Sequence, residues 1–209
     1  MKKLITAMLF CAPLSAMAAD ATVDLTFKGT LLQPTCSSSF VGTDGTDIAF
    51  GNINASDFVT MTSMTAGNPL ADGSTIGTAK NVFLQFAGCG GGVSQFNIEF
   101  GGPEITGYGV YSDKAPLLRI KDSPTVRTGL GFALFRNSTT TSVDDAIKFR
   151  SGKFSLAITD LTKDGETYKL PLYARIIMEQ RSNLDTSAEI NRLAGSDLIA
   201  SAWVKVDYQ

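Results

Sequence analysis

The sequence of 209 residues contains no histidine. This absence excludes the Ser/His and Cys/His arrangements of nucleophilic catalysis, and it removes the side chain that most often binds transition metals. Cysteine is also scarce, with three residues in the whole chain. These cysteines are too few and too far apart in sequence for a structural zinc site. We therefore expect no metal and no other cofactor.

Other catalytic patterns are weak. Two pairs of carboxylates, Asp144 with Asp145 and Asp160 with Asp164, could in principle hydrolyse glycosidic bonds. Solvated turn residues explain both pairs more simply. The glycine-rich stretch 88–93 has neither a following Lys-Ser/Thr nor a helical pattern, so it is not a phosphate-binding loop. We expect that the protein is not an enzyme.

The first residues lack the length of a membrane anchor, which requires about 20 apolar residues. Two lysines precede an apolar run over residues 4–14, and small residues follow at 16–18. This pattern predicts a secretory signal peptide over residues 1–19, cleaved after Ala18 or Ala19. The sequence therefore predicts export.

Positive charge is not in excess. Without Lys2 and Lys3 the chain keeps 16 basic and 20 acidic side chains, which is a net charge of −4. Nucleic acids and anionic membrane surfaces are bound by clustered positive charge. We therefore expect no nucleic-acid partner.

Two cysteines remain after the predicted signal peptide, Cys36 and Cys89. An oxidising compartment would let them form a disulfide, which on the chain-entropy model could stabilise the fold by roughly 4 kcal/mol. The alternative is a pair of unpaired, buried thiols.

Short alternating runs separated by Gly, Pro, Asn, Asp and Ser favour an all-β sandwich. The clearest strand candidates lie at 21–28, 47–53, 81–89, 94–102, 129–140, 152–161, 168–178 and 201–209. Residues 186–195 are predicted to form either a short helix or a loop turn. Residues 54–79 and 103–116 are expected to be long loops.

The strand predicted at 21–28 raises a question about its position. Val23, Leu25 and Phe27 alternate with polar residues, as a strand with one buried face requires. The strand nevertheless stands at the start of the mature chain, where residues are poorly ordered unless something holds them. It is either the first strand of a self-contained sandwich or a strand that another molecule buries.

Six stretches, taken in order, carry a resemblance to a known family. They are TFKGTLLQPTC, DIAFGNI, VFLQFAGC, GLGFALF, KLPLYARI and AWVKVDYQ. Behind a signal peptide, this series resembles the pilin subunits of bacterial chaperone-usher fimbriae, such as those of type 1 and P pili. The extra length at 54–79 and 182–197, and the lack of a glycine before Phe27, favour a minor subunit.

The resemblance implies an incomplete immunoglobulin-like β-sandwich that lacks its last strand and is completed by a donor strand. Residues 20–28 would be the donor extension and residues 29–209 the pilin domain. The donor side chains would be Val23, Leu25 and Phe27. The groove that receives a partner strand, from a chaperone or another subunit, would be lined by Val204, Val206 and Tyr208.

The partners implied by the resemblance are a periplasmic chaperone, an outer-membrane usher and neighbouring fimbrial subunits. The protein would then pass through the periplasm to the cell surface as part of a fimbrium. An alternative function is that of a carbohydrate-binding adhesive subunit, for which the loop 103–111, with Tyr108 and Tyr111, is the best candidate.

Overall fold

The structure is a computed structural model. It describes residues 36–63, 66–102, 113–149, 152–184 and 186–209. The predicted signal peptide, the predicted donor strand with Val23, Leu25 and Phe27, and the loop 103–111 therefore lie outside the described residues.

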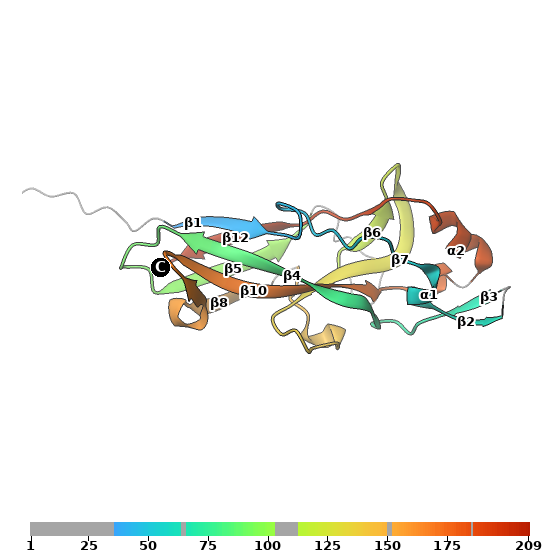
Figure 1. Cartoon of the computed structure of the whole chain (residues 1–209), viewed down its shortest axis with the longest axis horizontal. Helices are drawn as coiled ribbons and strands as arrows, with labels where there is room; N and C mark the ends of the chain where they lie inside the picture. Colours follow the sequence, from blue (N-terminus) through green and yellow to red (C-terminus); the bar gives the residue numbers. More distant parts are fainter. Residues whose placement is uncertain (1–35, 64–65, 103–112, 150–151, 185) are drawn as a thin grey trace, which may run out of the picture. The chain divides into compact units, whose positions relative to one another are not determined.

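Most of the described secondary structure is β-strand (Figure 1). The strands are β1 (Ser37–Val41), β2 (Val59–Ser63), β3 (Ala66–Pro69), β4 (Thr75–Ala87), β5 (Gln95–Gly101), β6 (Leu117–Ile120), β7 (Ser123–Phe135), β8 (Lys153–Ala157), β9 (Thr162–Asp164), β10 (Thr167–Met178), β11 (Leu198–Ile199) and β12 (Trp203–Tyr208). The helices are α1 (Ala55–Phe58) and α2 (Ser187–Leu193), with 3-10 turns η1 (Val143–Asp145), η2 (Ile158–Asp160) and η3 (Arg181–Leu184). The all-β prediction is confirmed.

The strands form antiparallel sheets. The larger sheet has the order β1-β4-β10-β7-β6-β11, with β9 paired to β10. A smaller sheet has the order β12-β5-β8, and β2 and β3 form a separate hairpin. This arrangement of two sheets around a common core is consistent with an immunoglobulin-like sandwich.

The main core lies between the larger and the smaller sheet. Its buried side chains include Val82, Leu84, Phe86, Phe96, Ile98, Phe100, Phe132, Leu134, Leu156, Leu170 and Leu172. The rings of Phe86 and Phe96 stack with their centroids 4.2 Å apart, which ties β4 to β5 across the core. Burying each such side chain is worth about 1.5–3 kcal/mol in transfer free energy. The strands predicted at 81–89 and 94–102 are therefore confirmed, and the strand predicted at 129–140 is observed as far as Phe135.

Two smaller clusters extend the packing. One cluster contains Phe58, Leu130, Met178, Leu184 and Leu193. It packs α1 and α2 against β7 and against the C-terminal end of β10. The other covers the opposite face of β7 with residues that include Val143 and Ala146. The last eight residues of β7 are consequently all buried, because both faces of that strand are covered.

Two predictions of secondary structure are wrong. Residues 47–53 do not form a strand, and only an isolated bridge links Asp44 to Asp47. The segment 54–79 is not a long loop, because it contains α1, the β2–β3 hairpin and the start of β4. Of the two alternatives for 186–195, the helix is the one observed: the Thr186 side chain accepts a hydrogen bond from the Glu189 backbone N–H at its first turn.

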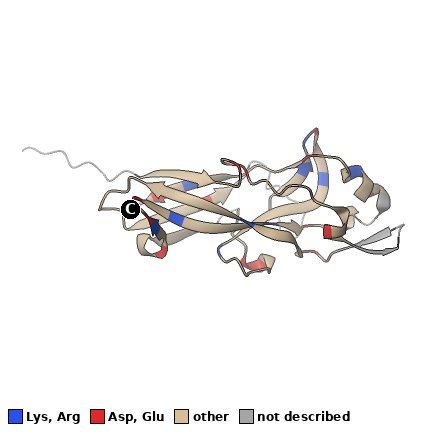
Figure 2. Cartoon of the chain, viewed as in Figure 1, with Lys and Arg blue, Asp and Glu red and all other residues tan. Residues whose placement is uncertain are grey.

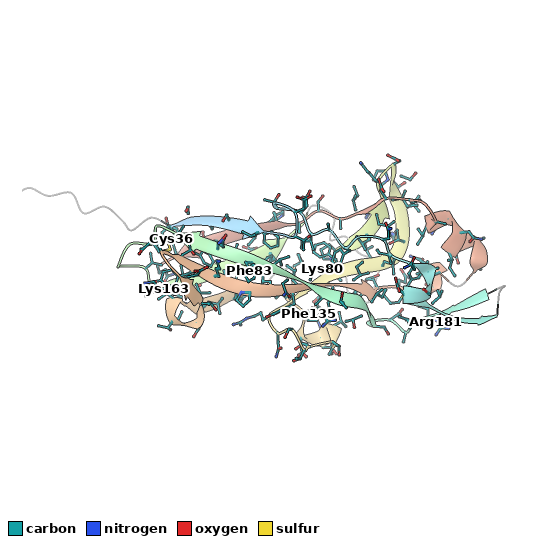
Figure 3. All side chains as sticks on the ribbon, in the orientation of Figure 1. Cys36, Lys80, Phe83, Phe135, Lys163 and Arg181 are labelled. Carbon is teal, nitrogen blue, oxygen red and sulfur yellow. A yellow bond between two sulfur atoms is a disulfide. The ribbon has the colours of Figure 1, made fainter. Side chains whose placement is uncertain are left out.

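A disulfide joins Cys36 to Cys89. Of the two alternatives for these cysteines, the disulfide is therefore the one observed. It links the residue before β1 to the segment that follows β4, and Figure 3 marks Cys36 at that end of β1. Because β1 pairs with β4 from Ser37 to Val41, the covalent bond closes one end of this strand pair.

In the view of Figure 2, basic and acidic residues are interspersed along the described ribbon. Several of them pair with one another, as Lys114 does with Asp144 at 3.0 Å and Lys153 with Glu99 at 3.6 Å. Exposed pairs of this kind contribute little to stability.

Candidate binding groove

A cavity of about 630 Å³ opens between two segments that lie far apart in sequence. One wall is the segment 46–50, and the other is the segment 198–204, which leads from β11 into β12. The other lining residues are Phe40, Phe100, Leu118, Phe132 and Leu134. We call this cavity and its two walls the groove.

The first wall is held by a turn rather than by a sheet. The Thr43 backbone N–H donates to the Asp47 carbonyl at 2.9 Å, and the Thr43 hydroxyl oxygen accepts from the Ala49 N–H at 2.7 Å. The following residues, 48–53, belong to no strand. Ile48 and Phe50 nevertheless pack partly buried against the core, so this segment lies along the sandwich without being paired to it.

The second wall includes β12. Val204 pairs with Phe100 of β5, and Val206 pairs with Ile98. Both valines are half-buried and pack against the main core, whereas Lys205 and Asp207 between and beside them are exposed. The alternation of β12 thus directs one row of apolar side chains inward.

The other side of β12 is an open edge. In the smaller sheet β12 is the terminal strand, and within the described part of the chain β5 is its single strand neighbour. In an antiparallel ladder, about half of the backbone N–H and C=O groups of a strand point away from its one partner. Such a row of groups is a template for pairing with another strand.

Exposed apolar side chains are concentrated on this wall. Among the described residues, the large hydrophobic side chains that are exposed are Ile199 (44%), Trp203 (48%) and Tyr208 (37%). All three lie in β11 or β12: Ile199 and Trp203 line the groove, and Tyr208 lies further along β12. Large apolar side chains exposed on neighbouring elements can mark an interaction site.

The groove is poor in chemical groups. Among its described lining residues Asp47 is the one that carries a charge, and the polar side chains are Thr46 and Ser201. A cavity of this composition can bury apolar side chains and can offer backbone hydrogen bonds at its rim.

The residues predicted for the groove have different positions in it. Val204 lines the cavity, whereas Val206 and Tyr208 lie further along β12, beyond the cavity itself. Trp203, which the alternation places on the other face of β12, contributes to the lining. Phe40 and Leu118 also line the groove and were not predicted from the sequence. Both come from the larger sheet, and the pattern within a single strand does not reveal contacts between sheets.

Three of the four carboxylates considered for catalysis have structural partners. Asp144 pairs with Lys114, Asp160 accepts from the Ala157 backbone N–H at 3.2 Å, and Asp164 pairs with Lys169 at 2.6 Å. Within the described ranges, no three side chains of the His, Cys, Asp and Glu types come together in a way that could hold a metal ion.

No helix in the described part of the chain has both the length and the apolar character needed to cross a membrane. No family model matches the sequence, and the search of curated proteins finds no match. Among solved structures, the chain is similar to the CupB6 tip adhesin from Pseudomonas aeruginosa, with 14% sequence identity and a TM-score of 0.36. The match covers 63% of this chain and 30% of that protein, so this chain corresponds to less than a third of the length of its structural neighbour.

Proposed function

We propose that the chain is a structural subunit of a chaperone-usher fimbria, which polymerises by donor-strand exchange and supports adhesion to surfaces. Residues 1–19 are removed on export, and residues 20–28 serve as the donor strand for a neighbouring subunit. The domain 29–209 receives a strand in its groove, first from a periplasmic chaperone and then, at the outer-membrane usher, from the next subunit. The protein thus passes through the periplasm to the cell surface.

One observation carries this proposal: an apolar groove opens beside the start of β12, whose outer edge has no strand neighbour among the described residues. The groove offers the two things that an added strand needs. Free backbone groups along an edge provide main-chain hydrogen bonds, and apolar pockets accept alternate side chains. A small-molecule site would be expected to contain several converging polar groups, which this groove does not have.

The predicted donor strand matches these requirements. Val23, Leu25 and Phe27 present three apolar side chains at every second position, which is the spacing that a groove lying along a strand selects. Burying three such side chains is worth about 1.5–3 kcal/mol each in transfer terms, before the costs of ordering and association are subtracted.

The alternative function, carbohydrate binding, depended on Tyr108 and Tyr111. These residues lie outside the described part of the chain, and no described feature favours this function over the first.

The test compares two aspartate substitutions in the full-length chain, co-expressed with the chaperone and usher of the source organism. Phe27→Asp places an unpaired charge in another subunit's groove, where desolvation is costly. We expect this variant to form the chaperone complex normally and to fail at incorporation into fibres. Val206→Asp damages the receiving domain itself, and we expect it to prevent the chaperone complex from forming.

The matched control is Thr26→Asp, which adds the same charge on the opposite face of the donor strand and should still assemble. Co-purification with the chaperone measures the first step, and the amount of subunit in isolated fibres measures the second. If Phe27→Asp abolishes the chaperone complex as completely as Val206→Asp does, residues 21–28 belong to their own domain and the polymerisation model is wrong.

A further inference from the structure

Trp203 and Gly101 face each other across β12 and β5. The indole lies directly over the glycine: a Cβ atom built on Gly101 would come within 2.6 Å of Cε2 and 2.7 Å of Cη2 of Trp203. Atoms of real side chains do not approach so closely, so the ring can occupy this position because residue 101 has no side chain.

The position of the indole ring determines whether the edge of β12 is accessible to an added strand. By lying over β5, the indole of Trp203 leans away from the side of β12 that has no strand neighbour among the described residues. Trp203 stands at the corner where the link from β11 enters β12, and it contributes to the mouth of the groove. A ring turned the other way from this corner would cover the place where an incoming strand begins to pair.

We propose that Gly101 is a positioning residue for strand docking, because it keeps the indole of Trp203 over β5 and so leaves the edge of β12 accessible. This inference rests on the proposed function of the groove. A side chain at position 101 pushes the ring off β5, and the ring can then move to the side of β12 that has no strand neighbour among the described residues. The ring then has to move before a strand can dock.

A purely structural role for the pair makes a different prediction. Aromatic rings often cover a glycine in a neighbouring strand and shield its backbone, which stabilises the pairing of the two strands. In that case, removing the ring would harm the domain whether or not residue 101 carries a side chain. Under our proposal, removing the ring repairs the defect that a side chain at residue 101 causes.

The experiment uses the full-length chain in its purified chaperone complex and a fluorescent peptide with the sequence of residues 20–30 as the incoming strand. We expect Gly101→Ala to lower the rate of peptide exchange by about tenfold, which corresponds to about 1.4 kcal/mol in the barrier. The double variant Gly101→Ala/Trp203→Ala should recover most of the lost rate. The matched control is Gly91→Ala, where an added Cβ meets no atom within 4 Å.

The outcomes separate the two levels of the proposal. If the wild-type complex does not exchange its strand for the peptide at all, the proposed function fails. If the wild type exchanges and Gly101→Ala exchanges equally fast, or if the double variant is as slow as Gly101→Ala, the positioning role is overturned.

A second measurement needs no variant and therefore holds even if Gly101→Ala fails to form a complex. Trp203 is the single tryptophan of the chain, so its fluorescence reports on this ring in a complex whose other components lack tryptophan or carry a non-fluorescent analogue. Because the ring lies over β5 before and after docking, we expect little change in its emission maximum and in its quenching by acrylamide. A large blue shift with loss of quenching on docking would show that the strand covers the ring, and would refute the proposal.

Discussion

Lys169 illustrates how one side chain on this surface serves two neighbours. Its Nζ lies 2.6 Å from Oδ2 of Asp164, and it also lies above the ring of Phe83, 6.0 Å from the centroid. Phe83 is marked on β4 in Figure 3. The hydrogen bond from Lys169, together with its charge, lowers the pKa of the Asp164 carboxyl below its ordinary value of 3.8.

The first prediction concerns this carboxyl. Because its pKa is lowered in the folded state, the stabilisation by the ion pair is present above the ordinary pKa and is lost as the pH falls through the lowered value. An NMR titration of the chain in its chaperone complex should give Asp164 a pKa below 3.8. Lys169→Gln should raise it towards that value.

The control for this titration is Lys153→Gln, which removes a lysine that pairs with Glu99 instead. It should leave the pKa of Asp164 where it was. Equal displacement of that pKa by both substitutions would mean that general charge, and not the contact with Lys169, sets it.

At the scale of elements, Gly129 shapes the junction between β7 and the end of β10. It has a φ of +77°, a conformation that other residues rarely adopt. Its carbonyl accepts hydrogen bonds from the backbone N–H groups of Glu179 at 2.8 Å and Gln180 at 2.9 Å. A Cβ atom at this position would meet the Gln180 carbonyl oxygen at 2.5 Å.

We therefore predict that Gly129→Ala destabilises the domain by about 1–3 kcal/mol, through backbone strain and the forced separation of the two strands. Urea unfolding of the chaperone-bound chain, followed by circular dichroism, measures the effect. Gly91→Ala, at an open position, should change stability by less than about 0.5 kcal/mol. An equal midpoint for both variants would contradict this account of Gly129.

Elements with a clear alternation of apolar residues could be predicted from the sequence. The core strands around 81–89 and 94–102 were found because their faces differ strongly in polarity. The segment 47–53 shows similar alternation at Ile48 and Phe50, and both side chains do pack on the core, but no strand among the described residues pairs with it. Side-chain alternation reports burial, whereas a strand also needs a partner for its backbone, and a single sequence does not show that partner.

The same limit applies to the groove. Alternation identified the apolar row of β12 that includes Val204, because that row is local in sequence. The rest of the lining depends on which strands meet: Phe40 comes from β1, Leu118 from β6 and Phe132 from β7. Pairing between strands so distant in sequence is a property of the folded chain, and no short pattern predicts it.

At the scale of the whole molecule, the groove should determine whether the chain can exist by itself. It combines an apolar cavity with an unpaired strand edge, and each of these features promotes aggregation. We predict that the chain expressed in the periplasm without its chaperone aggregates or is degraded, and that co-expression of the chaperone restores soluble protein. Fractionation and immunoblotting of periplasmic extracts measure both results.

A truncated chain provides the complementary control. With residues 20–28 deleted and no chaperone present, the chain lacks every proposed source of a completing strand. Recovery of a soluble monomer that unfolds cooperatively from this deletion would refute the idea of an incomplete sandwich.

The disulfide between Cys36 and Cys89 has a mechanical consequence if subunits are joined through the segment that precedes residue 36. A pull on that segment reaches Cys36 and passes through a covalent bond to the residues after β4. The force therefore does not pass through the hydrogen bonds between β1 and β4, and β1 cannot be separated from β4 beginning at Ser37. Under tension, the force then acts on contacts that no covalent bond holds. The noncovalent pairing between β12 and the added strand would therefore set the force at which two subunits separate.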